Sequence, residues 1–157
     1  MKIFIIISLL ICSLYPQTIK DISNVIGIRD NQLIGYGLIV GLPGTGDKSK
    51  FTMQSLQNLL TNSYIKIPAG SINSKNIAAV MVTADLPAFS RQGDKIKITV
   101  STIGDAKSID FGELLMTQLK GVDGNVYAVA QGTVVANTNN KTTGFIYEGA
   151  TVENEID

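Results

Sequence analysis

The feature of this 157-residue chain that most constrains its fold is a glycine-rich apolar run, NQLIGYGLIVGLPGTGDKS, at residues 31–49. Glycine inside a strand marks a bulge or a close approach between backbones, so residues 31–42 predict one long strand or two short ones. Pro43 and the turn-forming residues after it cannot hold regular structure and predict a loop. We interpret these glycines as structural: Gly35, Gly37, Gly41, Gly44 and Gly46.

The spacing of the later glycines is close to that of a phosphate-binding loop, but the residue that the chemistry requires is missing. In such a loop a lysine directly follows the last glycine, so that its ammonium group reaches the phosphates. Here Gly41 and Gly46 supply the frame, but Asp47 stands at the lysine position, where its carboxylate would repel phosphate. Lys48 and Ser49 follow one place late. The run therefore predicts no nucleotide site.

A dinucleotide-binding fingerprint is also incomplete in this run. Gly35 and Gly37 are followed by Val40 at the position where a third glycine is needed. We therefore expect the glycines to shape turns and tight strand packing rather than to hold a ligand. Replacement of Gly46 by valine should harm folding if the backbone at Gly46 has a positive φ.

The hydrophobic pattern changes period after the loop, over residues 51–65. Apolar side chains recur there at every third or fourth position, which predicts one face of an amphipathic helix. Asp47 or Ser49 could cap the start of this helix, and Pro68 and Gly70 lie beyond its end. The expected apolar face consists of Met53, Leu56, Leu60 and Tyr64, with Leu59 beside them.

The rest of the chain predicts strands joined by polar loops. Residues 24–28 are typical of a short strand, 76–86 of a strand covered on both faces, and 95–103 of a strand with one solvent-facing side. Residues 114–135 predict a hairpin with a type I′ turn at Asp123-Gly124. Loops are expected at 87–94, 104–113 and 136–144, before an acidic tail that lacks a closing element. The expected fold class is α+β, mostly strands and hairpins with one helix.

The residue types argue against catalysis. The chain has no histidine, and its one cysteine, Cys12, lies in the first hydrophobic run. The commonest general base, metal ligand and thiolate nucleophile are therefore missing. A formal net charge of zero and only 6% aromatic residues give no basic field and no base-stacking platform. We expect no enzymatic activity, no cofactor, no small-molecule substrate and no nucleic-acid partner.

One group of carboxylates leaves an alternative open. Asp105, Asp110 and Glu113 cluster in the sequence and could hold a cation, but they lack the spacing of a calcium loop. We interpret them as solvated loop charges. A periplasmic carbohydrate-active enzyme is a further alternative, although nothing fixes two carboxylates at a defined separation.

The N-terminus predicts export. Lys2 precedes a mostly apolar run from Ile3 to Tyr15, which is too short to span a bilayer and suits the core of a secretory signal. The alternative is a buried first strand or helix. We expect residues 1–18 to be a signal peptide and 19–157 to be the exported part, with no cysteine and therefore no disulfide.

Several long blocks in a fixed order resemble one known family. They are RDNQLIGYGLIVGLPGTGDKSKFTMQSLQNLL, KNIAAVMVTADLPAFSRQGDKIKITVSTIGDAKS, LLMTQLKGVDGNVYAVAQG and GATVENEI. Together they resemble the bacterial flagellar P-ring proteins from about Ile19 to the last residue. Members of that family are considerably longer, so we expect this chain to be an N-terminal portion, apparently truncated.

The resemblance implies a structural subunit of the flagellar basal body in the periplasm, without enzymatic activity or cofactor. Many copies close into a P ring at the peptidoglycan layer. With the L-ring protein they form a bushing around the rotating rod, for motility. Lys75, Lys107 and Arg91 match basic residues in the family blocks and are candidate charged contacts to the rod or to neighbouring subunits. The alternative is a peptidoglycan-binding adaptor that does not form a ring.

Overall fold

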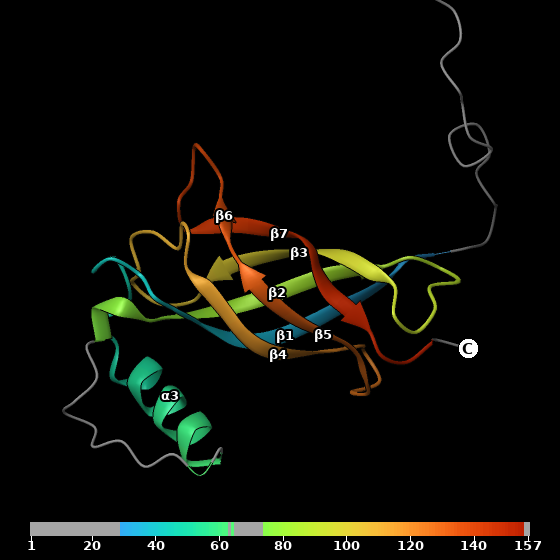
Figure 1. Ribbon diagram of the computed structural model, residues 1–157, viewed down its shortest axis with the longest axis horizontal. Coiled ribbons are helices and arrows are strands. Elements are labelled where there is room, and N and C mark those ends of the chain that lie inside the picture. Colours follow the sequence, from blue (N-terminus) through green and yellow to red (C-terminus); the bar gives the residue numbers. More distant parts are fainter. Residues whose placement is uncertain (1–28, 63, 65–73, 156–157) are drawn as a thin grey trace, which may run out of the picture.

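Figure 1 shows the computed structural model of the chain, in which residues 29–62, 64 and 74–155 are described. The expected signal peptide at 1–18, the expected strand at 24–28, and Pro68 and Gly70 lie outside these residues. The regular elements are β1 (Asn31–Val40), α3 (Lys50–Asn62), the 3-10 helix η2 (Ser74–Asn76), β2 (Ala78–Leu86), β3 (Lys95–Thr102), β4 (Glu113–Lys120), β5 (Val126–Thr133), β6 (Val135–Ala136) and β7 (Thr143–Val152).

Strands of the described chain close into an antiparallel barrel (Figure 1). They are hydrogen-bonded in the order β3-β2-β1-β4-β5-β7, and pairing of β3 with β7 completes the ring. The short strand β6 adds to β7. Closure matters because, among the described strands, it leaves no long edge free for pairing with another chain. The prediction of mostly strands and hairpins with one helix is confirmed, and the fold is more specifically a mostly-β barrel plus one helix.

The alternation of side chains along the strands fills the barrel interior. In β3, Ile96, Ile98 and Val100 are buried while Lys95 and Lys97 are exposed, as predicted. The same period of two holds in the second half of β2, because successive side chains of a strand point to opposite faces. The largest fully buried side chains include Leu33, Ile39, Leu86, Ile98, Leu114, Leu119, Val80, Val82 and Val100.

A second apolar layer lies between α3 and the outer face of the barrel. It consists of Leu38, Leu56, Ile77 and Ala79, with Val40, Met53, Leu60 and Leu115 packed against them. Only the first half of β2 is therefore covered on both faces. Thr83 and Asp85, in its second half, are exposed. The expectation of two-sided cover along all of 76–86 is wrong for this half, because the helix layer reaches only Ile77 and Ala79.

The helix itself is confirmed, with shifted limits. It begins at Lys50 and ends at Asn62, and the N–H of Phe51 donates to Ser49 Oγ at 3.2 Å, so Ser49 is the cap. Two expected members of its apolar face are wrong: Leu59 is 36% exposed and Tyr64 is 98% exposed. Tyr64 follows the last helical residue and so does not share the buried stripe. Within the described residues no helix is both long and apolar enough to cross a membrane.

The strand β7 was not predicted from the sequence, and it is the strand that closes the barrel. It pairs with β5 on one side and β3 on the other. The loop expected at 136–144 is confirmed over 137–142, but the expectation that no closing element follows is wrong, because β7 begins at Thr143. The register against β3 shifts between Ile96 and Ile98, and Tyr147 and Glu148 are both exposed in succession. A bulge of this kind breaks the period of two that reveals a strand.

The hairpin of β4 and β5 is confirmed, but its turn type is wrong. The N–H of Gly124 donates to the carbonyl of Gly121 at 3.0 Å, so Val122 and Asp123 are the central turn residues. Neither has a positive φ, whereas Gly124 has φ 83°. A type I′ turn needs positive φ at both central residues, so the connection is instead a turn followed by one left-handed glycine.

Gly35 and Gly37 lie where the backbone of β1 packs tightly against β4. The register between these strands shifts between Ile34 and Ile39. A Cβ on Gly37 would lie 2.6 Å from Thr117 Oγ1, and one on Gly35 would meet the carbonyl of Gln118. Side chains at these two positions would force β1 and β4 apart.

Candidate interaction surface

The two ends of the barrel carry different loops (Figure 1). At the left-hand end of the view, backbone hydrogen bonds link the segments 41–49, 74–77, 103–112 and 134–142. We call this the lysine end. At the right-hand end lie the loops 87–94 and 121–125, and we call this the hairpin end.

The lysine end is organised around Asp47, which is completely buried. Its carboxylate accepts hydrogen bonds from the N–H of Ala79 at 2.8 Å, the N–H of Ala106 at 2.7 Å and the hydroxyl of Thr52 at 2.8 Å. These donors belong to β2, to the 103–112 segment and to the first turn of α3. The expectation that Asp47 could cap the helix is therefore wrong. Its carboxylate instead joins three parts of the chain. Sequence reasoning missed this role, because the residue was judged only as a poor phosphate-loop position or as a cap.

Two glycines make room for this junction. A Cβ on Gly46 would lie 2.7 Å from the carbonyl oxygen of Lys75 and would also press on the backbone of Ile77. A Cβ on Gly104 would lie 2.5 Å from Asp47 Oδ1. Gly46 does not have a positive φ, so the reason given above for expecting damage from valine at this position does not apply. Glycine is needed there because the backbones of Lys75 and Ile77 leave no room for a side chain.

Gly41 and Gly44 require glycine for a different reason from Gly46. Both have φ 79°, and a Cβ on either would meet nothing within 4 Å. Their need for glycine is conformational, because L-residues with a side chain adopt this region at a cost.

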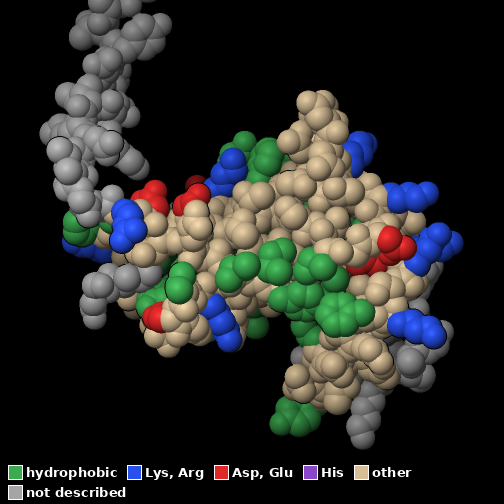
Figure 2. Space-filling model, turned by 180° about the vertical axis from the view of Figure 1, so that it is seen from behind, with side chains coloured by type: hydrophobic (Ala, Val, Ile, Leu, Met, Phe, Trp, Pro, Cys, Tyr) green, Lys and Arg blue, Asp and Glu red, His purple; other side chains and the backbone are tan. Residues whose placement is uncertain are grey.

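The structure brings Lys75 and Lys107 together. The N–H of Gly46 donates to the carbonyl of Lys75 at 2.6 Å, and the N–H of Lys107 donates to the carbonyl of Thr45 at 2.7 Å. The two exposed lysines thus flank one dipeptide, although they are far apart in the sequence. Figure 2 shows basic side chains gathered along the right-hand edge, with acidic atoms among them, and this edge is the same end seen from behind. The exposed lysines of its loops and of the start of α3 are Lys48, Lys50, Lys75, Lys107 and Lys141.

Arg91 lies at the hairpin end, apart from the two lysines. Its N–H donates to Asp94 Oδ2 at 2.8 Å, and the N–H of Asp94 donates back to the carbonyl of Arg91 at 3.0 Å. Any contact that Arg91 makes with another molecule therefore uses a different surface from that of Lys75 and Lys107.

The suggested carboxylate cluster does not converge. Asp105 Oδ1 accepts the N–H of Lys48 at 2.8 Å, Asp110 Oδ1 accepts the N–H of Ala136 at 3.1 Å, and Glu113 Oε2 accepts the hydroxyl of Thr133 at 2.8 Å. Each carboxylate serves a separate local contact. Among the described residues there is no group of three or more side chains placed to hold a metal ion.

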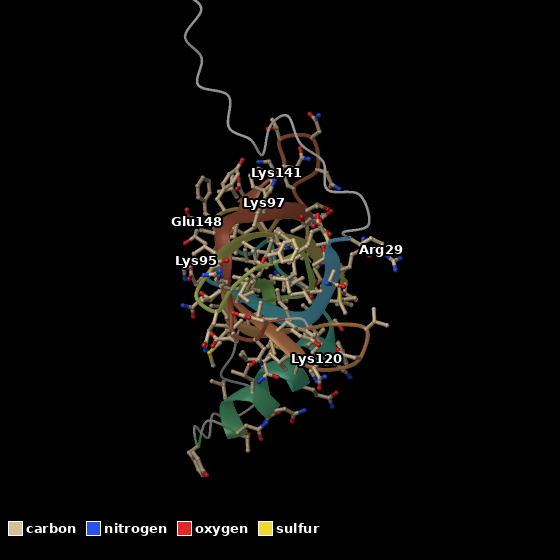
Figure 3. All side chains as sticks on the ribbon, turned by 90° about the vertical axis from the view of Figure 1, so that its right-hand side faces the viewer. Arg29, Lys95, Lys97, Lys120, Lys141 and Glu148 are labelled. Atoms are coloured by element: carbon tan, nitrogen blue, oxygen red, sulfur yellow. The ribbon has the colours of Figure 1, made fainter. Side chains whose placement is uncertain are left out.

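The outer wall of β3 and β7 carries an aromatic and basic cluster. Lys97 Nζ lies 4.7 Å from the centre of the Phe145 ring and 5.3 Å from that of Tyr147, distances typical of cation–π contacts. Figure 3, viewed from the hairpin end, places Lys95, Lys97 and Glu148 on one side of the barrel and Arg29 on the other. This wall is the solvent-facing side that the alternation in 95–103 predicts.

Another part of the wall is apolar. Ile34, Tyr36 and Met116 line an open groove of about 500 Å³, and the Phe51 ring meets that of Tyr36 edge-on with centres 6.0 Å apart. Figure 2 shows hydrophobic side chains gathered in a patch on this face of the molecule. The polar side chains that line the groove are those of Tyr36, Thr117, Gln118 and Lys120, and its described lining includes no histidine, cysteine or carboxylate.

These features define a class of protein: a β-barrel module that exposes lysines on its loops and apolar side chains on its wall. Residues 18–157 match the protein-family model described as flagellar P-ring protein. The chain belongs to the flagellar P-ring protein family, a family of structural proteins rather than enzymes.

Individual relatives agree with this assignment. The chain is 86% identical over 156 residues to the flagellar P-ring protein of Aliarcobacter butzleri, covering 99% of this chain and 45% of that protein. It is 60% identical over 146 residues to that of Helicobacter pylori, covering 91% and 43%. The match to the protein of Wolinella succinogenes is 54% over 165 residues, covering 99% and 47%. The chain thus spans less than half the length of these relatives.

Proposed function

We propose that this chain is the N-terminal portion of a subunit of the flagellar P ring in the periplasm. Many copies would form a ring at the peptidoglycan layer and, with the L ring, a bushing around the rotating rod. The observation that carries this proposal is the family match over residues 18–157, supported by relatives that share its sequence along nearly all of the chain. Because the relatives are more than twice as long, the remaining part of the protein would contribute to the assembly.

Within this function, the lysine end is the proposed contact surface to the rod or to a neighbouring subunit. Lys75 and Lys107 project from loops that are fixed by two short backbone hydrogen bonds to Thr45 and Gly46. The buried Asp47 anchors the same dipeptide to β2 and α3. Exposed charges on a rigid frame suit a bushing, since they hold a partner without the large desolvated area that would resist rotation.

Charge reversal tests this surface. The double variant Lys75→Glu, Lys107→Glu should reduce P-ring assembly and swimming while leaving export unchanged, because both side chains are exposed. The assay uses the full-length Aliarcobacter butzleri protein with residues 18–157 of this chain in place of its matching part, expressed in a strain without its own P-ring protein.

The matched control is Lys95→Glu, Lys120→Glu, which changes the net charge equally at exposed sites outside the lysine end. Normal swimming of the Lys75, Lys107 variant would remove the lysine end from the mechanism. Arg91→Glu is assayed separately, because Arg91 is a candidate contact at the opposite end.

Export is a second part of the proposal. We infer that residues 1–18 are a cleaved signal peptide, which the start of the family match at residue 18 supports. N-terminal sequencing of protein from the periplasmic fraction should give a first residue close to 19. Recovery of the chain in the cytosol with Met1 still present would contradict both the signal and the proposed location.

A further inference from the structure

Phe111 combines an exposed aromatic ring with a strained backbone. It lies in the 103–112 segment of the lysine end and is 77% exposed. Its φ is 57°, in the left-handed region that bulky residues adopt only at a cost in free energy. Backbone strain of this kind persists where the surrounding structure enforces it, and it occurs preferentially at functional sites.

The surrounding structure does enforce it. The N–H of Phe111 donates to the carbonyl of Val134 at 3.0 Å, and the N–H of Val134 donates to the carbonyl of Gly112 at 2.9 Å. Gly112 in turn packs inward, where a Cβ would lie 2.6 Å from Leu42 Cδ2. The chain therefore turns its small residue into the core and holds the ring of Phe111 outside.

The ring also lies within the basic surface described above. Lys107 precedes it in the same segment, and the N–H of Ile109 donates to the carbonyl of Lys141 at 3.0 Å, which brings that lysine's loop alongside. The carboxylates nearest to the ring in the sequence each accept a hydrogen bond: Asp110 from the N–H of Ala136 and Glu113 from the hydroxyl of Thr133. Aromatic residues, phenylalanine among them, are enriched in the cores of protein–protein interfaces, so an exposed ring at a basic surface suits such a contact.

We propose that Phe111 is an anchor residue of the lysine end, which inserts into an apolar recess on an acidic protein surface. Lys107 and Lys75 contact the acidic rim of that recess and steer the approach. The ring supplies the apolar contact that lysines alone cannot make, and the framework holds it ready so that little conformational freedom is lost on binding. This inference rests on the proposed function, because it takes the lysine end to be a contact surface.

The test uses the substitution Phe111→Gly, which separates stability from contact. Glycine accepts a positive φ freely, so the isolated chain should keep or raise its melting temperature. Recovery of assembled rings from cells carrying the full-length chimaera should fall roughly tenfold or more, as for loss of an aromatic hot spot. Phe111→Tyr, which keeps the ring, should restore assembly.

The matched control is Phe89→Gly at the hairpin end. Phe89 is also exposed and has φ 65°, so it shares the ring and the strain but not the location. It should leave assembly intact. Normal assembly with Phe111→Gly, an equal loss with Phe89→Gly, or a clear drop in the melting temperature of Phe111→Gly would each overturn the inference. If Phe111→Gly assembles normally while the Lys75, Lys107 reversal does not, the anchor fails and the proposed contact surface stands.

Discussion

The two ends of the barrel each use an aspartate that accepts three hydrogen bonds, but in opposite environments. Asp47 at the lysine end accepts from Ala79, Ala106 and Thr52 and is completely buried. Asp123 at the hairpin end accepts from the backbone N–H and side-chain amide of Asn125 and from the Tyr127 hydroxyl, and it is exposed. The partners of Asp47 are distant in sequence, whereas those of Asp123 lie within four residues.

The difference teaches that burial, rather than the number of hydrogen bonds, decides what an aspartate contributes. If the Asp47 carboxylate is removed, its three donors remain buried without partners, and each such donor costs about 1–3 kcal/mol. If the Asp123 carboxylate is removed, water replaces it at little cost. The lysine end should therefore be a cooperative part of the fold, and the hairpin end should tolerate change.

Asp47→Ala is expected to have the largest effect. The variant should lose at least about 3 kcal/mol of unfolding free energy, because the junction among β2, α3 and the 103–112 segment is left unsatisfied. Urea denaturation of the chain measures this. Asp105→Asn in the same end is the control, since Asp105 is exposed and accepts one hydrogen bond from Lys48. A loss of similar size in both variants would show that burial of Asp47 is not the cause.

Substitutions of two glycines at the lysine end are expected to cause stability losses between those of the Asp47 and Asp123 variants. Gly46→Ala should cost about 2–3 kcal/mol, because its Cβ would push against the backbone of Ile77 and Lys75. Gly44→Ala should cost only about 1–2 kcal/mol, since its φ is positive but the space around it is open. Thermal denaturation of both variants checks the order. If Gly44→Ala were the more damaging variant, close packing at Gly46 would not be the dominant constraint.

Asp123 is expected to give the smallest effect, and one that depends on pH. The hydrogen bond from Tyr127, followed by that from the backbone of Asn125, holds the pKa of Asp123 below the ordinary aspartate value of 3.8. Its stabilising contribution is therefore present above pH 3.8 and is lost as the pH falls through the lowered pKa of the folded state. Asp123→Asn should be slightly less stable than the parent at pH 7.

Melting temperatures measured from pH 7 to pH 2 check this sign. The gap between Asp123→Asn and the parent should close toward the acid limit. A gap that widens on acidification would contradict the direction of the shift.

The sequence predicts some elements well and others poorly, for physical reasons. The strand at 95–103 and the helix after Ser49 have regular periods, because one side of each meets solvent. β7 was missed, because the bulge at Tyr147 and Glu148 interrupts its alternation. Spacing places Leu59 beside the apolar face of α3, which is why it was expected to be buried. Spacing does not show how much of that face the barrel covers, and the barrel leaves Leu59 exposed.

Some features of the candidate surface could also be predicted from the sequence, and others could not. The basic residues Lys75 and Lys107 could be selected from the resemblance to the family, without knowledge of their surroundings. Their placement on either side of Thr45 and Gly46 required the fold. The exposure of Phe111 and the strain in its backbone had no signal in the sequence, since a phenylalanine is ordinarily expected in a core.

The sequence by itself determined the strand periods, the helix, the turn-forming glycines and the family, because these follow from local residue patterns or from direct similarity. Only the tertiary structure decided that β3 meets β7, that Asp47 is buried and that two distant lysines share one loop frame. Each of these depends on contacts between segments that are remote along the chain. Burial and hydrogen-bond partners depend on such contacts. For this reason Asp47 joins distant segments at one end of the barrel, whereas Asp123 stabilises only a local turn at the other.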